Sequence, residues 1–282
     1  MSRPSFLVLG ESGDALAQGV AAAMRSATAR ADDVLWLTPT NLVRARWEHR
    51  VSTAGARTRV FVSGEWHALD GVVATLNRLR WLPASGTFTS DDDADYAASE
   101  RHALVISALH GLSGVVVNPP APPSLSGPDL TPAAWLRLAA RLGLPVREAV
   151  VTTDGRRHPR GGWQPARWPS LEPEPAGLPI GERPVVWLAP MQVTGRCWVV
   201  GESTIASDGS AAEVPGLDLR SLARAARCQL LEVLVGRGGS GRMVLAAVDP
   251  FPVDLPTAVH EAVLALLVDG RLGGPSARAT GR

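Results

Sequence analysis

The N-terminal part of the chain alternates short apolar runs with helical stretches, and this alternation limits the folds open to it. An Ala-rich stretch runs from about Ala15 to Ser26, and an acidic triplet at residues 91–93 opens a long helical stretch that reaches about His110. Acidic residues favour the positive end of the helix dipole. The runs interpreted as buried strands are residues 6–9, 34–37, 72–76 and 115–117. Because strand–helix alternation is typical of a parallel sheet, this part predicts an α/β domain.

Turn signals complete the reading of this first part. Residues 38–41 (Thr-Pro-Thr-Asn) predict a turn and cap ahead of a helix over residues 42–47. Ser63-Gly64 separates two strand-like runs, and a two-residue link of this kind predicts a hairpin. Gly10–Asp14 opens a helix after a strand, a setting in which backbone N–H groups bind anions. It lacks a dinucleotide fingerprint, so we interpret it as an ordinary strand-to-helix turn.

The second half has a different pattern. Thr131-Pro132 caps a helix to about Leu142, and a last helix is expected over residues 257–267. Residues 154–183 are rich in Pro, Gly, Arg and Trp and show no periodicity, which predicts a loop. Strands are expected at residues 148–152, 185–188, 197–202, 230–235 and 243–248, with a helix over residues 217–227. This predicts an α+β domain with antiparallel hairpins over residues 126–282, after an α/β domain over residues 1–125.

The chain contains no lysine, since all 28 of its basic residues are arginine. Schiff-base, pyridoxal and P-loop enzymes each depend on a lysine amine, so ordinary members of these classes are excluded. Codon usage in a GC-rich genome explains the bias, but the chemical consequence does not depend on its origin.

The remaining composition favours a cytoplasmic protein that binds neither nucleic acid nor membrane. The net charge of +1 gives no reason to expect polyanions. Two cysteines are too few for a disulfide framework or a zinc site, and the six histidines show no ligand spacing, so we expect no metal site. The N-terminus lacks a signal-peptide pattern, and the apolar stretch over residues 262–268 is too short to span a bilayer.

Four segments follow one another along the chain in an order that is found in a known family. They are Val72–Arg78 with Glu100 and Asn118-Pro119-Pro120; Trp135–Thr152; Val185–Gly201 with Arg196; and Leu217–Pro252, ending Val-Asp-Pro-Phe-Pro. In this order they resemble the ATP-grasp superfamily, particularly ligases of the ribosomal-peptide and glutamate-ligase type. The resemblance covers nearly the whole chain. It implies an N-terminal parallel-sheet domain followed by a reduced ATP-grasp-like α+β domain.

The departures from this family bear on mechanism. The family activates a carboxylate as an acyl phosphate, holding the triphosphate with two lysines and Mg²⁺, because the transferred group needs cations around it. This chain has Ala247 in place of the metal-bridging Glu, Asp249 in place of Asn, and Leu234 in place of the metal Asp. Glu232 replaces the lost acid only if the strand register allows it, since residues two apart share a face. The segment between Thr153 and Val185 is also short for the usual ATP lobe.

The resemblance and the sheet edge together nominate six ligand-binding candidates: Arg78, Arg80, Glu100, Asn118, Arg196 and Asp249. Arginines at the carboxyl end of a strand suit a carboxylate or phosphate clamp, although an exposed pair explains them equally. Arg196 either replaces lysine at a phosphate or forms a structural ion pair. Asn118 either faces the cleft of Glu100 or serves the turn ahead of two prolines.

The segment over residues 154–183 supplies the candidates for partner binding. Trp and Arg are favoured anchors at protein interfaces. The candidates are Arg160, Trp163, Arg167 and Trp168. The alternative is a linker without a partner.

These observations predict a degenerate, non-catalytic ATP-grasp protein that binds a protein or peptide in a peptide- or protein-maturation pathway. No cofactor is expected. One alternative is an active ATP-dependent carboxylate–amine ligase that uses arginine in place of lysine, with ATP and Mg²⁺. Another is a nucleotide-binding or glycosyltransferase-like α/β protein unrelated to ATP-grasp. The sequence leaves a homo-oligomer open.

Overall fold

The fold comes from a computed structural model that describes residues 2–28, 31–84, 86, 90–122, 124–153, 162–166, 185–209, 214, 217–238 and 241–272. These residues divide into two compact units. Unit 1 contains the described residues up to Pro128, together with Arg227–Leu230 and residues 253–272, and unit 2 contains Asp129–Ala226 and Leu231–Pro252. Our expected division lay after residue 125, with the whole remainder in one domain. The last helix belongs to unit 1.

Unit 1 is built on a four-stranded parallel sheet of order β2-β1-β6-β7. The strands are β1 (Phe6–Leu9), β2 (Val34–Leu37), β6 (Ala74–Asn77) and β7 (Val115–Val117). Every residue of β1 and β6 is buried, as expected for central strands with both faces covered. Helix α1 (Ala15–Ala27) packs on β1 and β2, and α6 (Thr257–Leu272) packs on α1, β6 and β7. These are the strands predicted from the apolar runs.

A three-stranded antiparallel sheet of order β3-β4-β5 completes the β structure of unit 1. Its strands are β3 (Arg46–Ser52), β4 (Gly55–Val62) and β5 (Glu65–Ala68). Ser63 and Gly64 join β4 to β5 with φ angles of 54° and 90°, so the predicted hairpin is confirmed with the turn geometry that favours glycine. The helix predicted over residues 42–47 is wrong in its bounds. Helix α2 spans Pro39–Arg44, capped by Thr38, and β3 follows it directly.

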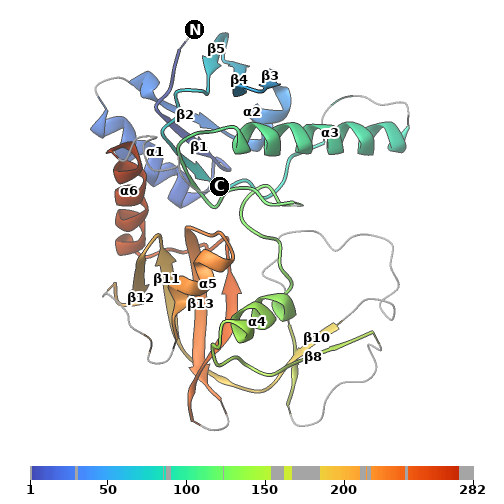
Figure 1. The fold of residues 1–282 in the computed structure, drawn as a ribbon, viewed down its shortest axis with the longest axis vertical. Helices are drawn as coiled ribbons and strands as arrows, with labels where there is room; N and C mark the ends of the chain where they lie inside the picture. Colours follow the sequence, from blue (N-terminus) through green and yellow to red (C-terminus); the bar gives the residue numbers. More distant parts are fainter. Residues whose placement is uncertain are drawn as a thin grey trace. The chain divides into compact units, whose positions relative to one another are not determined.

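Helix α3 (Asp91–His110) is the longest helix, and its two halves differ. Its buried residues, Val105, Ala108 and Leu109, all lie in the C-terminal half and join the core of unit 1. Figure 1 shows the N-terminal half extending away from the parallel sheet. Residues 91–103 are exposed or half-buried throughout. One half of α3 therefore belongs to the core, and the other half presents itself to solvent.

Unit 2 contains two antiparallel sheets, of orders β8-β10-β9 and β12-β11-β13-β14. Helix α4 (Pro132–Arg141), capped by Thr131, packs on β14 and β8, and α5 (Leu219–Ala225) packs on β11 and β12 (Figure 1). The strands are β8 (Ala149–Thr152), β9 (Gln164–Pro165), β10 (Val185–Leu188), β11 (Gln192–Val200), β12 (Ser203–Ala206), β13 (Leu230–Arg237) and β14 (Met243–Asp249). The predicted antiparallel second half is confirmed.

Three details of unit 2 differ from the predictions. Strand β11 begins five residues earlier than the expected strand at residues 197–202, and β12 was not expected. The segment predicted to be a loop over residues 154–183 contains the two-residue strand β9, which pairs with β10.

Among the described residues, no helix is long and apolar enough to cross a membrane.

Candidate functional site

Two clusters of charged side chains contain the candidates from the sequence, and the one in unit 1 lies where β6 ends. Arg78 follows β6, and its Nε donates to Oδ2 of Asp14 at 2.9 Å. Oδ1 of the same carboxylate caps α1 by accepting from the backbone N–H of Ala17 at 2.9 Å. Arg78 is only 4% exposed. The structure therefore places Arg78 in a buried ion pair that fixes the start of α1, and not in an exposed pair of arginines.

The neighbours of Arg78 explain this burial. A Cβ added to Gly10 would meet the Cβ atoms of Arg78 and Ala17, both at 3.2 Å, so Gly10 allows the strand ends and α1 to approach closely. His260 of α6 belongs to the same group, which the sequence did not indicate. Burial lowers the pKa of His260, the charge of Asp14 opposes this shift, and the charge of Arg78 adds to it. Arg80, two residues further along, is half-buried.

Asn118 has a structural task at the end of β7. It adopts a positive φ of 56°, and its side-chain Oδ1 accepts from the backbone N–H groups of Gln229 and Leu230, both at 2.9 Å. Its Nδ2 donates to the carbonyl of Leu230 at 2.8 Å. Asn77 reinforces the turn by donating to the carbonyl of Asn118 at 3.0 Å. Asn118 thus holds residues 229 and 230 against the end of β7. This is the turn role that was the alternative considered for it.

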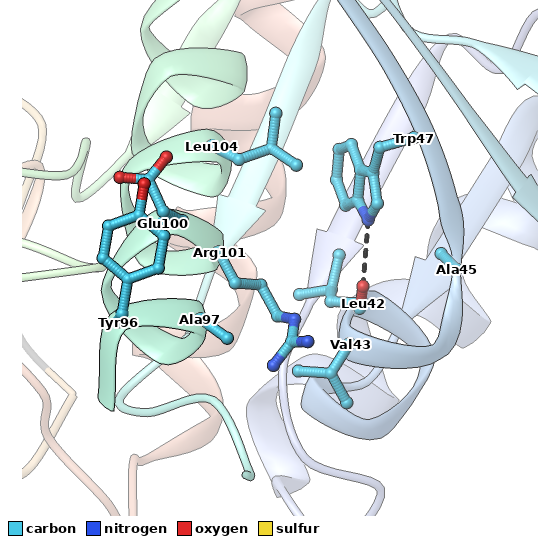
Figure 2. Close-up of a pocket in the computed structure, with 9 residues that line it drawn as sticks. All are labelled: Leu42, Val43, Ala45, Trp47, Tyr96, Ala97, Glu100, Arg101 and Leu104. Carbon is cyan, nitrogen blue, oxygen red and sulfur yellow. Dashed lines mark hydrogen bonds between the residues drawn. The ribbon is translucent and has the colours of Figure 1, made fainter. Parts of the chain in front are cut away.

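Glu100 lies apart from Arg78 and Asn118, on the exposed half of α3. It lines a pocket of about 650 Å³ between α3 and the α2–β3 corner. Figure 2 shows Glu100 beside the ring of Tyr96, and Arg101 reaching from α3 towards Leu42 and Val43. The other lining residues are Ala45, Trp47, Ala97 and Leu104. Sequence reasoning missed this pocket, because β3 was not expected to follow α2.

The cluster in unit 2 joins β11, β13 and β14. The carboxylate of Glu232 on β13 forms an ion pair with Nε of Arg196 at 3.2 Å and accepts a hydrogen bond from Nε1 of Trp198 at 3.1 Å. The guanidinium of Arg196 also lies 5.9 Å from the ring centroid of Trp198. Glu232 is 8% exposed, whereas the side chain of Arg196 is 44% exposed. The ion-pair alternative for Arg196 thus has a partner that lies on the neighbouring strand.

The register of β13 and β14 settles whether Glu232 comes near Asp249. Glu232 is the direct partner of Asp249, and Leu234 is the partner of Ala247. Directly opposed residues of an antiparallel pair lie on the same face. The register therefore brings Glu232 beside Asp249, so the two carboxylates lie on one face of the sheet.

Both carboxylates have partners within the protein. Protein-bound Mg²⁺ is usually held by one or two carboxylates together with phosphate oxygens. Glu232 already faces a guanidinium and an indole N–H, and Oδ1 of Asp249 accepts from the backbone N–H of Phe251 at 2.8 Å. A cation at Glu232 would compete with Arg196 for the carboxylate. In the described part of the chain, no group of three or more His, Cys, Asp or Glu residues is placed to hold a metal ion.

The remaining candidates divide by their position. Trp163 is half-buried beside β9. Arg160, Arg167 and Trp168 lie outside the described residues. Both cysteines are buried, and burial raises the pKa of Cys228 to about 12 and also raises that of Cys197, so neither thiol is prepared as a nucleophile.

No family model and no curated protein matches this sequence. Solved structures do match it. Macrocyclase MdnB from Microcystis aeruginosa MRC has a TM-score of 0.66 at 16% identity, over 95% of this chain and 99% of that chain. ATP-grasp ligase PsnB, complexed with minimal precursor, Mg and ADP, has a TM-score of 0.66 at 18% identity, over 94% and 98%. A RiPP-associated ATP-grasp ligase from Chryseobacterium gregarium, in complex with ADP and a leader and core peptide, has a TM-score of 0.64 at 10% identity, over 95% and 97%.

This likeness establishes the fold. The chain has the fold of ATP-grasp ligases over nearly its whole length, which confirms the fold that the resemblance implied. The alternative of an α/β protein unrelated to ATP-grasp is wrong, because unit 2 has the antiparallel sheets that such a protein would lack.

Proposed function

We propose that this chain is a non-catalytic ATP-grasp-fold protein that binds a peptide or protein in a peptide-maturation pathway. The observation that carries the proposal is the state of Glu232. Its carboxylate, two residues before the position where the family has its metal-binding Asp, pairs with Arg196 and Trp198.

The charge balance supports the same conclusion. Transfer of a phosphoryl group depends on cations that stabilise the charge spread over its oxygens. The chain has no lysine to supply them. The arginine that matches the family pattern, Arg196, is paired with Glu232 through Nε, so a triphosphate bound there would compete with that carboxylate.

The peptide partner is proposed from solved structures with this fold. They include ligases solved with a precursor peptide or with a leader and core peptide. This step is an analogy of fold, and it requires a direct test.

A thermal-shift experiment on the full chain tests the loss of nucleotide binding. A ligand that binds the folded state with a Kd of about 1 µM stabilises it by roughly 4 kcal/mol when the ligand is present at about 1 mM. This moves the midpoint of thermal unfolding by several degrees. We expect 1 mM ATP with Mg²⁺ to leave the midpoint of this chain unchanged. A shift of several degrees that requires Mg²⁺ would contradict the proposal.

A second candidate function is favoured by the strand register. Because Glu232 and Asp249 are direct partners and Arg196 adjoins Glu232, an active ligase could use two carboxylates and an arginine in place of the usual groups. This candidate predicts peptide-dependent ADP release that Glu232→Gln or Asp249→Asn abolishes. The matched control is Glu202→Gln, at an exposed position outside the cluster. Release that is absent, or that survives both changes, would count against this candidate.

A further inference from the structure

The three-stranded sheet β3-β4-β5 of unit 1 has two unlike faces. Directly opposed residues of an antiparallel pair share a face, so the strand register assigns each side chain to one of the two. One face holds Thr58, Val60 and His67, which are all buried. The other face, here called the arginine face, carries four arginines and one carboxylate: Arg46, Arg50, Arg57, Arg59 and Glu48. The proposed function does not use this face.

The arginines on this face outnumber the carboxylate that serves them. Glu48 accepts from Nε of Arg59 at 2.6 Å and forms an ion pair with Nε of Arg50 at 2.8 Å. Arg57 is exposed, and it is the direct cross-strand partner of Arg50. Like charges in directly opposed positions destabilise a sheet. Within the part of the chain that the structure describes, no carboxylate pairs with Arg57. The face therefore retains an unfavourable pair, and departures of this kind are expected at functional sites.

Two aromatic rings on the same face hold arginines in position. Cζ of Arg46 lies 5.4 Å from the ring centroid of Phe61, and Cζ of Arg59 lies 4.7 Å from that of Trp66. The two rings contact each other edge to face, with their centroids 5.4 Å apart. A guanidinium stacked on a ring has fewer conformations to lose when it binds a ligand. The charge on this face is therefore preorganised.

The arrangement suits carboxylates better than a nucleic acid. A planar guanidinium matches the geometry of a carboxylate, and the two oxygens of Glu48 already bind different arginines. Single-stranded nucleic acids bind largely by stacking their bases on exposed aromatic rings. Here the rings of Phe61 and Trp66 carry guanidinium groups instead. The negative charge of Glu48 in the middle of the face would also repel a continuous chain of phosphates.

The spacing of the arginines indicates an extended ligand. Arg57 and Arg59 are two residues apart on β4, so they are about 7 Å apart along one face. An extended peptide with acidic residues at alternate positions has the same repeat. We propose that the arginine face binds an extended acidic segment of a partner protein. Its carboxylates pair with Arg50 and Arg57 and so remove the repulsion between them. The inference rests on the proposed function only in that the partner is a polypeptide.

Fluorescence anisotropy of the full chain with a labelled peptide tests this proposal. In the peptide Glu alternates with Ser, and its length is about twice that of β4. We expect saturable binding that weakens as the salt concentration rises, because exposed charge pairs are screened. The same peptide with Gln in place of Glu should not bind. Labelled oligothymidylate with the same number of charges should bind more weakly than the Glu peptide, and tighter binding of the oligonucleotide would overturn the proposal.

A pair of matched variants locates the binding site. Arg50→Gln/Arg57→Gln should weaken binding of the Glu peptide by about tenfold, and it should not lower the urea midpoint, because it removes an opposed pair of like charges. Arg137→Gln/Arg141→Gln removes two exposed arginines of α4 and should leave the affinity unchanged. Absence of binding to the wild-type chain, equal losses in the two variants, or a lower urea midpoint for Arg50→Gln/Arg57→Gln would overturn the proposal.

The thermal-shift experiment with ATP keeps this inference separate from the proposed loss of nucleotide binding. A chain that binds the Glu peptide and is also stabilised by ATP with Mg²⁺ would contradict the proposed function and support the acidic partner. A chain that binds neither ligand would overturn the acidic partner alone.

Discussion

The two charged clusters have similar components but differ in what surrounds them. In unit 1, Asp14 holds Arg78 and caps a helix with the same carboxylate, and the arginine is 4% exposed. In unit 2, Glu232 is buried but its arginine partner, Arg196, remains 44% exposed at the side chain. A buried pair whose partner is removed leaves an uncompensated charge, whereas an exposed arginine is solvated when its partner is lost. The first cluster therefore belongs to the framework, and the second is the place where a ligand could compete.

The largest effect should come from breaking the pair in unit 1. Arg78→Ala leaves the carboxylate of Asp14, whose side chain is 11% exposed, without its cation. We expect the free energy of unfolding to fall by about 3–5 kcal/mol in urea titrations. The matched change in unit 2, Arg196→Ala, also leaves a carboxylate that is only 11% exposed, but the arginine it removes is 44% exposed and Glu232 keeps its hydrogen bond from Trp198. We therefore expect a smaller loss there, of about 1–3 kcal/mol. Equal losses at the two positions would remove the distinction between the clusters.

A smaller loss is expected at Asn118. Asn118→Ala leaves the buried backbone groups of residues 229 and 230 without the three hydrogen bonds that this side chain supplies. Alanine also tolerates the positive φ of 56° at this position less well than asparagine does. We expect a loss of about 2–3 kcal/mol in the same titrations. Asn118→Gly keeps the backbone conformation accessible, so the difference between the two variants separates the backbone contribution from the side-chain contribution.

Glu232 distinguishes hydrogen bonding from charge in unit 2. Glu232→Gln keeps an acceptor for the indole N–H of Trp198, and Glu232→Ala removes it. We expect Glu232→Ala to cost about 1–3 kcal/mol, since a buried donor is left unsatisfied, and Glu232→Gln to cost less. Indole fluorescence during unfolding provides the measurement. Equal losses for Glu232→Gln and Glu232→Ala would show that the negative charge, and not the acceptor for Trp198, accounts for the stability.

The smallest effect is a dependence on pH in unit 1. The pKa of His260 lies below its usual value of 6.5 in the folded chain, mainly through burial. The unfolded chain therefore binds the proton more tightly, and stability should decrease as the pH falls below 6.5 towards the folded pKa. His260→Gln should flatten this part of the stability profile. The charges of Asp14 and Arg78 shift the pKa of His260 in opposite directions. A profile that becomes steeper in His260→Gln would mean that a group other than His260 causes the dependence on pH.

The sequence predicted the parts of the fold that depend on local patterns. β1 and β6 were found because strands buried on both faces form continuous apolar runs. β3 was missed because its residues are half-buried or exposed, so that no run or alternation marks it. The assignment of α6 to unit 1 depends on its packing against α1 and β6, which no local pattern reports.

The candidate sites were predictable to a lesser degree, because they depend on register and on distant pairs. Arg78 and Asp14 are 64 residues apart, and only the close approach at Gly10 brings them together. The role of Glu232 was left to the strand register, and no local pattern indicated that Asp249 would be its direct partner. A shift by one residue would have turned either side chain to the other face. The pocket on α3 required β3, so it could not be predicted once that strand had been missed.

The paired state of Glu232 is tested most directly by isothermal titration of the full chain with ATP, with and without Mg²⁺. If Arg196 and Trp198 occupy the carboxylate as the geometry indicates, neither titration should give saturable heat, and Glu232→Gln should behave as the wild type does. Micromolar binding that depends on Mg²⁺ and is lost in Glu232→Gln would contradict the account.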